Sequence, residues 1–280
     1  MTLDLSQISR LGFGVSGPHK CDAVDRSLTV RLIREAIDLG ISVFDTAPKY
    51  GDGEAEIRLG KALKDVDRDR LFIVTKAGIL DETDRRDFTP EGVRASLHGS
   101  LKRLGVDRVD ALLLQGAASG ELTDALQACL QDLKDSGLVH YIGFSGRGGE
   151  LDEPARAELF DIIMAPNYAG MPEELTLRLK TARAVGKRVF AIEAKNGARS
   201  SLRLPLGKAD RWYFKRQVKR LWNRLSGSPV PPGSQLPVIE AFRWSMDCPL
   251  TDCLMVQTTN SRHLRELAQM AGLDAGHGGA

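Results

Sequence analysis

The segment FDTAPKYGDGEAE, residues 44–56, decides the fold and raises the first question about chemistry. An apolar run, SVFDTA (42–47), contains the acid Asp45 at its end, and Tyr50 follows five residues later. Gly51 and Gly53 allow the loop to turn sharply into the next helical segment. A short run of this kind is typical of a buried strand, so a carboxylate at its end needs a reason.

Seven similar runs follow or precede this one, and helical segments separate them. Apolar side chains recur every three or four residues between the runs, and in residues 89–105 Thr89 is a good helix cap with Pro90 at the first helical position. About eight strands alternate with about eight helices, which predicts a parallel sheet with right-handed crossovers. An open doubly wound sheet and a closed barrel both fit, but eight units in 280 residues favour a (β/α)₈ TIM barrel. The seven runs are LGFGV (11–15), LFIVTK (71–76), VDALLLQG (109–116), YIGFSG (141–146), DIIMAPN (161–167), RVFAIEA (188–194) and DCLMVQTT (252–259).

Composition narrows the class of protein. The chain is 42% hydrophobic with a net charge of +2, which gives no electrostatic argument for nucleic-acid binding. Its four cysteines lack the spacing of a metal site, so we expect free thiols in a reducing compartment and no metal. No secretory signal and no run of eighteen apolar residues occurs, so we expect a cytoplasmic protein without a membrane span.

Polar residues stand at the ends of three consecutive predicted strands. Asp45, Lys76 and Gln115 end strands two, three and four, and Tyr50 lies on the loop after strand two. In a parallel barrel these ends meet at one rim, where such enzymes place their chemistry. A phenol is a weak acid, but a neighbouring ammonium favours its ionised form, and a carboxylate keeps that ammonium charged. Each residue alone has a structural explanation as a turn cap or ion pair, whereas the set favours acid–base catalysis.

Longer segments extend the pattern to a known family. GISVFDTAPKYGDGEAEIRLGKAL (40–63), RLFIVTKAG (70–78), SLKRLGVDRVDALLLQG (100–116) and LKDSGLVHYIGFSG (133–146) resemble the aldo-keto reductases in order and spacing, over about residues 10–270. The resemblance implies NADP(H) or NAD(H) as cofactor, and hydride transfer between the nicotinamide and the carbonyl carbon of a small substrate. By matching, Tyr50 would be the proton donor, Lys76 the partner that favours its ionised form, and Asp45 the partner of that lysine.

The sequence departs from the family at several positions. Gln115 replaces the fourth catalytic residue, a histidine, and an amide can donate a hydrogen bond but cannot titrate. On strand five Ser145 matches, but Gly146 replaces an asparagine; on strand six Met164 replaces a glutamine, with Asn167 as a substitute.

The cofactor-phosphate region departs as well. Gln257 and His263 occupy the positions of the lysine and arginine that NADP-preferring members carry after strand eight. Thr259, Asn260 and Ser261 still open a helix whose N–H groups suit a pyrophosphate, although Ser261 is equally well explained as a cap. The predicted cofactor-binding residues are therefore Ser145, Asn167, Arg199, Thr259, Asn260, Ser261 and His263.

A basic insertion, residues 198–236, follows strand seven within the single predicted domain, 1–280. Between Arg199 and Arg224 it holds nine Lys or Arg and one acid, Asp210. Three interpretations stay open: a lid with solvated charges, a contact of Arg199, Arg203 or Lys208 with cofactor phosphates or an acidic substrate, and a contact with a membrane surface or nucleic acid.

Three functions are consistent with this sequence. The first is an NAD(P)(H)-dependent oxidoreductase that acts on a small or sugar-like carbonyl or alcohol. The second is a non-redox acid–base enzyme on the same scaffold, for elimination or isomerisation. The third is a non-catalytic nucleotide-binding regulatory subunit, which the presence of Asp45, Tyr50 and Lys76 argues against.

Overall fold

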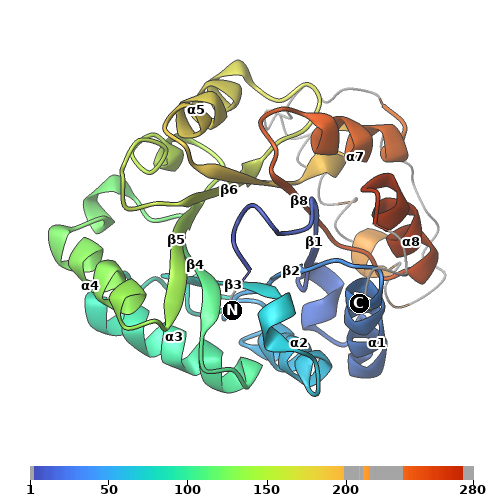
Figure 1. The fold of residues 1–280 in the computed structure, drawn as a ribbon, viewed down its shortest axis with the longest axis horizontal. Helices are drawn as coiled ribbons and strands as arrows, with labels where there is room; N and C mark the ends of the chain where they lie inside the picture. Colours follow the sequence, from blue (N-terminus) through green and yellow to red (C-terminus); the bar gives the residue numbers. More distant parts are fainter. Residues whose placement is uncertain (1–2, 199–207, 209–210, 215–217, 219–235, 274–280) are drawn as a thin grey trace.

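Eight parallel strands close into one barrel in which each strand pairs with its neighbours in sequence, and β8 pairs with β1 (Figure 1). The computed structural model describes residues 3–198, 208, 211–214, 218 and 236–273. This architecture confirms the predicted (β/α)₈ barrel. The strands are β1 (Leu11–Gly14), β2 (Val43–Asp45), β3 (Phe72–Ala77), β4 (Val109–Gln115), β5 (Val139–Ser145), β6 (Ile162–Pro166), β7 (Arg188–Ile192) and β8 (Cys253–Val256).

Helices surround the barrel and pack their apolar faces on its outer surface (Figure 1). The predicted cap of α3 is confirmed: the Thr89 hydroxyl accepts a hydrogen bond from the N–H of Gly92, and Pro90 is the first helical residue. Within the described ranges no helix is long and apolar enough to cross a membrane. The helices are α1 (Arg26–Asp38), α2 (Glu54–Leu63), α3 (Pro90–Leu104), α4 (Asp124–Asp135), α5 (Glu173–Ala184), α7 (Val238–Asp247) and α8 (Ser261–Met270).

The alternation of side chains along each strand separates two apolar cores. One core fills the barrel, and the second lies between the strands and the helices. On β6, for example, Met164 faces the barrel interior, whereas Ile163 and Ala165 face the helices. Because position within a strand fixes this direction, it also decides which polar residues reach the rim. The barrel core comprises Val43, Phe72, Val74, Ala111, Leu113, Ile162, Met164, Phe190, Cys253 and Met255.

Aspartates at or just before the starts of three even-numbered strands tie the amino-terminal rim together. The carboxylates of Asp110, Asp161 and Asp252 accept hydrogen bonds at 2.6, 2.9 and 2.7 Å from backbone N–H groups of the preceding strand. Each carboxylate also pairs with a nearby cation: Arg68, Lys134 and Arg183, respectively. These repeated contacts assign the amino-terminal rim to stability, as is usual in such barrels, and leave the carboxyl-terminal rim for chemistry.

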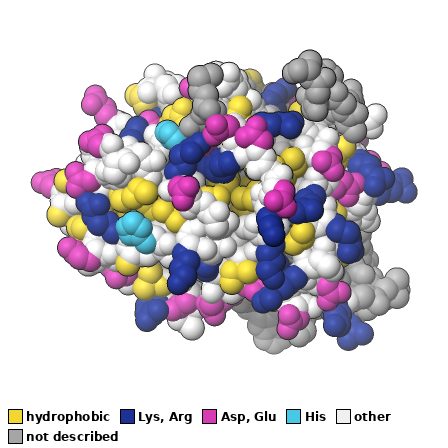
Figure 2. All heavy atoms as spheres, turned by 60° about the horizontal axis from the view of Figure 1, so that its bottom comes forward, with side chains coloured by type: hydrophobic (Ala, Val, Ile, Leu, Met, Phe, Trp, Pro, Cys, Tyr) yellow, Lys and Arg dark blue, Asp and Glu magenta, His cyan; other side chains and the backbone are white. Residues whose placement is uncertain are grey.

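The surface mixes charges of both signs. Figure 2 shows basic and acidic side chains interspersed over one face of the molecule, around apolar side chains. Arg199 and most of the predicted insertion, 198–236, lie outside the described residues, so the three interpretations of that segment stay open.

Candidate active site

Asp45 and Lys76 form a buried ion pair at the carboxyl-terminal rim. Both side chains point into the barrel from the ends of β2 and β3, with exposures of 6% and 1%. The Lys76 ammonium donates to the Asp45 carboxylate and, at 2.8 Å, to the carbonyl oxygen of Thr46. The lysine is thus held by two acceptors on the neighbouring strand end, which fixes the position of its Nζ.

Tyr50 lies beside this pair. The Nζ of Lys76 is 5.0 Å from the centroid of the half-buried Tyr50 ring. Burial opposes the charge on Lys76, but Asp45 and Tyr50 outweigh it, so the pKa of Lys76 is raised and the ammonium persists. Gly51 and Gly53 adopt positive φ angles of 65° and 91°, which direct the chain from Tyr50 into α2. The structure therefore brings together the acid, the amine and the phenol.

Gln115 and Ser145 stand side by side on the same rim. They are partners in the register between β4 and β5, and both occupy positions that face the barrel interior. Ser145 is 4% exposed. Among the residues that the structure describes, the buried Oε1 of Gln115 has no hydrogen-bond partner. Because a buried amide without a partner is costly, this pair is suited to receive a polar ligand.

Three of the predicted cofactor-binding side chains are engaged in contacts within the protein. Asn167 lies outside the barrel interior, because interior positions on β6 are even-numbered, and its Nδ2 donates to Thr251 at 2.8 Å. Asn260 caps α8: its Oδ1 accepts from the N–H of Arg262 at 2.9 Å. Ser261 donates to Glu35 on α1 at 2.6 Å. Thr259 and His263 are half-buried near the start of α8.

The structure adds two charged residues that the sequence did not single out. Arg147, two residues after the end of β5, donates from Nε to Glu193, which directly follows β7, at 2.8 Å. Burial opposes the charge on Arg147, but Glu193, the phenol of Tyr50 and Glu150 outweigh it, so the pKa of Arg147 is raised and the guanidinium stays charged. Both residues follow strand ends in the sequence, but no sequence pattern pairs them with each other.

His19 connects the loop after β1 to the loop after β8, beneath the rim. It is fully buried, and its Nε2 lies 2.9 Å from the carbonyl oxygen of Thr258. Its Nδ1 lies 3.1 Å from the hydroxyl of Thr29 on α1. Because the carbonyl can only accept, Nε2 carries the proton of a neutral imidazole. Burial is the main cause that lowers the pKa of His19 to about 4.

The free energy of unfolding should therefore fall on the acid side because of His19. The unfolded chain binds a proton near pH 6.5, whereas the folded protein binds it only near pH 4, so the contribution is complete above pH 6.5 and is lost as the pH falls towards 4. Between pH 7 and pH 4.5 we expect a loss of about 2 kcal/mol by urea denaturation, absent in His19→Gln. The exposed His98→Gln is the control and should follow the wild type; parallel curves for His19→Gln and wild type would contradict the assignment.

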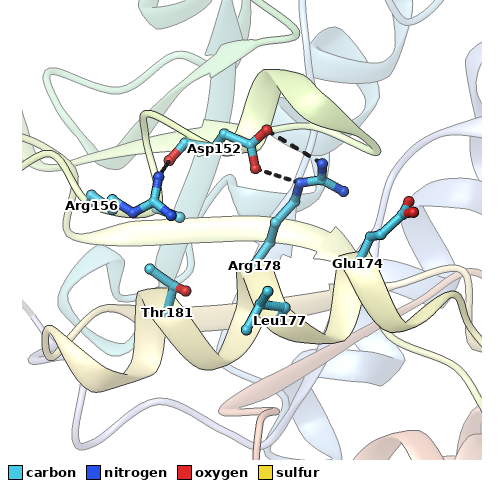
Figure 3. Close-up of a pocket in the computed structure, with 7 residues that line it drawn as sticks. Asp152, Arg156, Glu174, Leu177, Arg178 and Thr181 are labelled. Atoms are coloured by element: carbon cyan, nitrogen blue, oxygen red, sulfur yellow. Dashed lines mark hydrogen bonds and ion pairs between the residues drawn. The ribbon is translucent and has the colours of Figure 1, made fainter.

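A surface pocket of about 140 Å³ lies away from this rim. Figure 3 shows it between α5 and the segment that follows β5, crossed by the ion pair between Arg178 and Asp152 at 2.7 Å. Arg178 lowers the pKa of Asp152, so the pair stays ionised and mutually neutralised. The pocket holds no side chain that faces Tyr50, and we assign it no part in the chemistry.

Comparison with known proteins places the chain in a family. The sequence profile described as the Aldo/keto reductase family matches residues 10–168, which include the ends of β2 to β5. Together with the closed barrel and the arrangement of Asp45, Tyr50 and Lys76, this match shows that the chain belongs to the Aldo/keto reductase family.

Two curated relatives and two solved structures illustrate the similarity. The NADH-specific methylglyoxal reductase of Escherichia coli (strain K12) is 32% identical over 161 residues, 51% of this chain and 49% of that protein. The L-galactose dehydrogenase of Arabidopsis thaliana is 38% identical over 151 residues, 50% of this chain and 45% of that protein. The matched region thus spans about half the length of these relatives.

The solved structures share the fold. An aldo-keto reductase from Bacillus halodurans, in its holo form, superposes with a TM-score of 0.73 at 22% identity, covering 94% of this chain and 86% of that one. One from Klebsiella pneumoniae, in complex with NADPH, gives 0.69 at 19% identity, covering 96% and 88%. At this level of identity the likeness concerns the fold.

Proposed function

We propose that this protein is an NAD(P)(H)-dependent oxidoreductase that interconverts a carbonyl and an alcohol on a small or sugar-like substrate. The observation that carries the proposal is the contact of Asp45, Lys76 and Tyr50 at the carboxyl-terminal rim. The names of the relatives, a methylglyoxal reductase, an L-galactose dehydrogenase and a D-threo-aldose 1-dehydrogenase of Pseudomonas sp, support this chemical class.

Tyr50 would transfer the proton. In reduction it donates its hydroxyl proton to the substrate oxygen, and in oxidation its phenolate takes the proton back. The ammonium of Lys76 stabilises the phenolate, and Asp45 keeps the ammonium charged and in place. Gln115 would donate a hydrogen bond to the same substrate oxygen without titrating. The proton thus has one donor, and the residues around it control position and charge.

A nicotinamide cofactor, NADP(H) or NAD(H), would supply or accept the hydride when bound. The rim fits the amide end of such a cofactor, because Ser145 is buried beside the unpartnered Oε1 of Gln115 within the described structure. Asn260 and Ser261 are held by contacts at the start of α8, so side-chain contacts to a phosphate are assigned to neither. Because Asn260 already accepts from the N–H groups of Arg262 and His263, the backbone N–H of Ser261 and the side chain of Thr259 stay as proposed phosphate contacts.

Binding of reduced cofactor tests the proposal directly. Titration of the purified protein with NADPH and with NADH, followed by nicotinamide fluorescence, should show a dissociation constant in the micromolar range for at least one of them. Ser145→Ala should weaken that affinity roughly fivefold to tenfold, because one buried hydrogen bond is lost. If neither NADPH nor NADH binds, the proposal is wrong.

One observation keeps a second function in view. Met164 on β6 is the register partner of Ser145, and the side-chain amide of Asn167 donates to Thr251. Few polar groups therefore surround the proposed position of the nicotinamide carboxamide. A non-redox enzyme that uses Tyr50 and Lys76 for elimination or isomerisation would need none of them. It predicts turnover by the purified protein without any nicotinamide, and an activity assay in the absence of cofactor separates it from the first proposal.

A further inference from the structure

The ion pair between Arg147 and Glu193 lies at the carboxyl-terminal rim of the barrel. Arg147 follows β5 and Glu193 follows β7, so the pair passes over the end of β6, which lies between them in the sheet. Arg147, Glu193 and Tyr50 each follow the carboxyl end of a strand, so they stand at the same rim of the barrel. A substrate whose carbonyl oxygen reached Tyr50 would therefore have this pair at its side.

The backbone at Glu193 is strained in a way that serves the pair. Glu193 adopts a left-handed conformation, with φ 63° and ψ 24°, which costs a residue with a side chain about 1 kcal/mol. Glycine would adopt it without that cost. The conformation breaks the alternation of β7 at the residue that holds Arg147. Strain retained beside a catalytic rim points to a function for the side chain that it positions.

Arg147 is held from two directions while its outer nitrogens stay available. Its backbone N–H donates to Glu150 at 2.7 Å, and its Nε donates to Glu193. Within the described residues Nη1 and Nη2 make no hydrogen bond, and the side chain is 58% exposed. Glu193 accepts at its other oxygen from Asn196 at 2.9 Å. The pair therefore leaves the two terminal nitrogens of Arg147 available as donors.

Other cations near this end of the barrel have carboxylate partners as well. Lys20 pairs with Glu82, Lys49 with Asp84, and Arg86 with Glu121 through its terminal nitrogen. Glu121 accepts from both Nε and a terminal nitrogen of Arg86, whereas Glu193 accepts only from the Nε of Arg147. Two parallel N–H donors of a guanidinium match the two oxygens of a carboxylate or phosphate.

We infer that Arg147, held by Glu193, binds an anionic group, phosphate or carboxylate, on the carbonyl or alcohol substrate, and so determines specificity. This inference deepens the proposed function and rests on it for the identity of the reacting group. The anion would lie on the open side of the guanidinium, with its two oxygens on Nη1 and Nη2, while the reacting carbon lies beside Tyr50. Arg147 is in this role a specificity residue, and Glu193 positions it.

Calorimetry with two matched pairs of alcohols tests the inference independently of turnover. Glycerol 3-phosphate is compared with glycerol, and 4-hydroxybutyrate with 1-butanol, each with and without saturating NADPH or NADH. We expect the wild type to bind at least one anion roughly tenfold or more tighter than its neutral partner. The arm that shows the preference identifies phosphate or carboxylate. If neither anion is preferred, the inference is wrong.

Three variants separate specificity from structure. Arg147→Gln should abolish the preference, and Arg147→Lys should keep part of it. Arg94→Gln is the matched control, because Arg94 is a partly exposed arginine on α3 with one carboxylate partner, Asp132 at 2.7 Å, and it should keep the wild-type preference. A preference that survives Arg147→Gln would overturn the inference. So would a parallel loss of NADPH or NADH affinity in that variant, because Arg147 would then bind the cofactor.

Glu193→Gly provides a readout that a purely structural role would not give. Removal of the strain should leave the denaturation midpoint unchanged or raised, while the anion preference falls roughly fivefold to tenfold because Arg147 is no longer held. A lowered midpoint with an unchanged preference would assign the pair to stability and overturn the inference. Failure of the proposed function is distinct: anion preference would persist, but no carbonyl would be turned over with either cofactor.

Discussion

Tyr50→Phe should lower kcat for reduction of a carbonyl substrate by roughly 10²–10⁴-fold, while the affinity for reduced nicotinamide stays within about twofold of the wild type. The substitution removes one oxygen atom and keeps the half-buried ring beside Lys76. What is lost is the proton that the substrate oxygen needs as the carbonyl is reduced. Single-turnover mixing of enzyme, cofactor and substrate measures this loss apart from product release.

Tyr141→Phe is the control for this experiment. Tyr141 is also half-buried, but it packs against the barrel core and its hydroxyl donates to Asp4 at 3.3 Å, at the opposite end of the barrel. Its loss should leave kcat unchanged. If instead Tyr50→Phe turned over at the wild-type rate, the acid would have to be another group, and the proposed role of Tyr50 would be wrong.

The sequence predicts the rim because two regular features determine it. Strand and helix alternate along the whole chain, so all strands run parallel and end at one edge. The two-residue period within each strand then decides which side chains point inward. Asp45, Lys76, Gln115 and Ser145 all lie at inward positions at or near the ends of adjacent strands. A pattern that depends only on order and period can be read from the sequence.

The same period shows why the prediction for Asn167 was incomplete. Asn167 was chosen because it stands at the end of its predicted strand. In the structure it follows Pro166, the last residue of β6, and faces away from the barrel interior, into which Met164 points. Its side chain donates to Thr251. The engagement of Asn260 and Ser261 was equally hidden, because a cap and a contact with α1 depend on how α8 sits against its neighbours. Strand ends can be read from a sequence, whereas side-chain partners from other elements cannot.

Glu193 shows a different limit. Sequence alternation places it on the outer side of β7, yet its left-handed backbone brings its carboxylate to Arg147 across β6. Left-handed residues other than glycine and asparagine carry little sequence signal. The charge pair at the mouth of the barrel therefore became visible only in three dimensions, although both residues follow strand ends in the sequence.

Asp45→Leu should lower the free energy of unfolding by about 3–5 kcal/mol, because it leaves the buried ammonium of Lys76 without its carboxylate. Lys76→Met should cost a similar amount by leaving Asp45 uncompensated. The double variant Asp45→Leu/Lys76→Met should recover most of this loss, since an apolar pair of similar volume needs no desolvation of charge. Its kcat should stay roughly 10²–10⁴-fold below the wild type, as for Tyr50→Phe, because nothing then stabilises the phenolate.

The pair between Glu56 and Arg103 is the matched control. Glu56 is fully buried on α2 and accepts from Arg103 at 2.7 Å and from the hydroxyl of Thr75 on the helix-facing side of β3, outside the barrel interior. Glu56→Leu/Arg103→Met should change kcat by less than about twofold, whatever its effect on stability. Recovery of stability without recovery of activity at Asp45 and Lys76 would show that this buried pair exists for chemistry. A double variant as unstable as the two single variants combined would show that the pair holds the barrel together, and its place beside Tyr50 would then need another explanation.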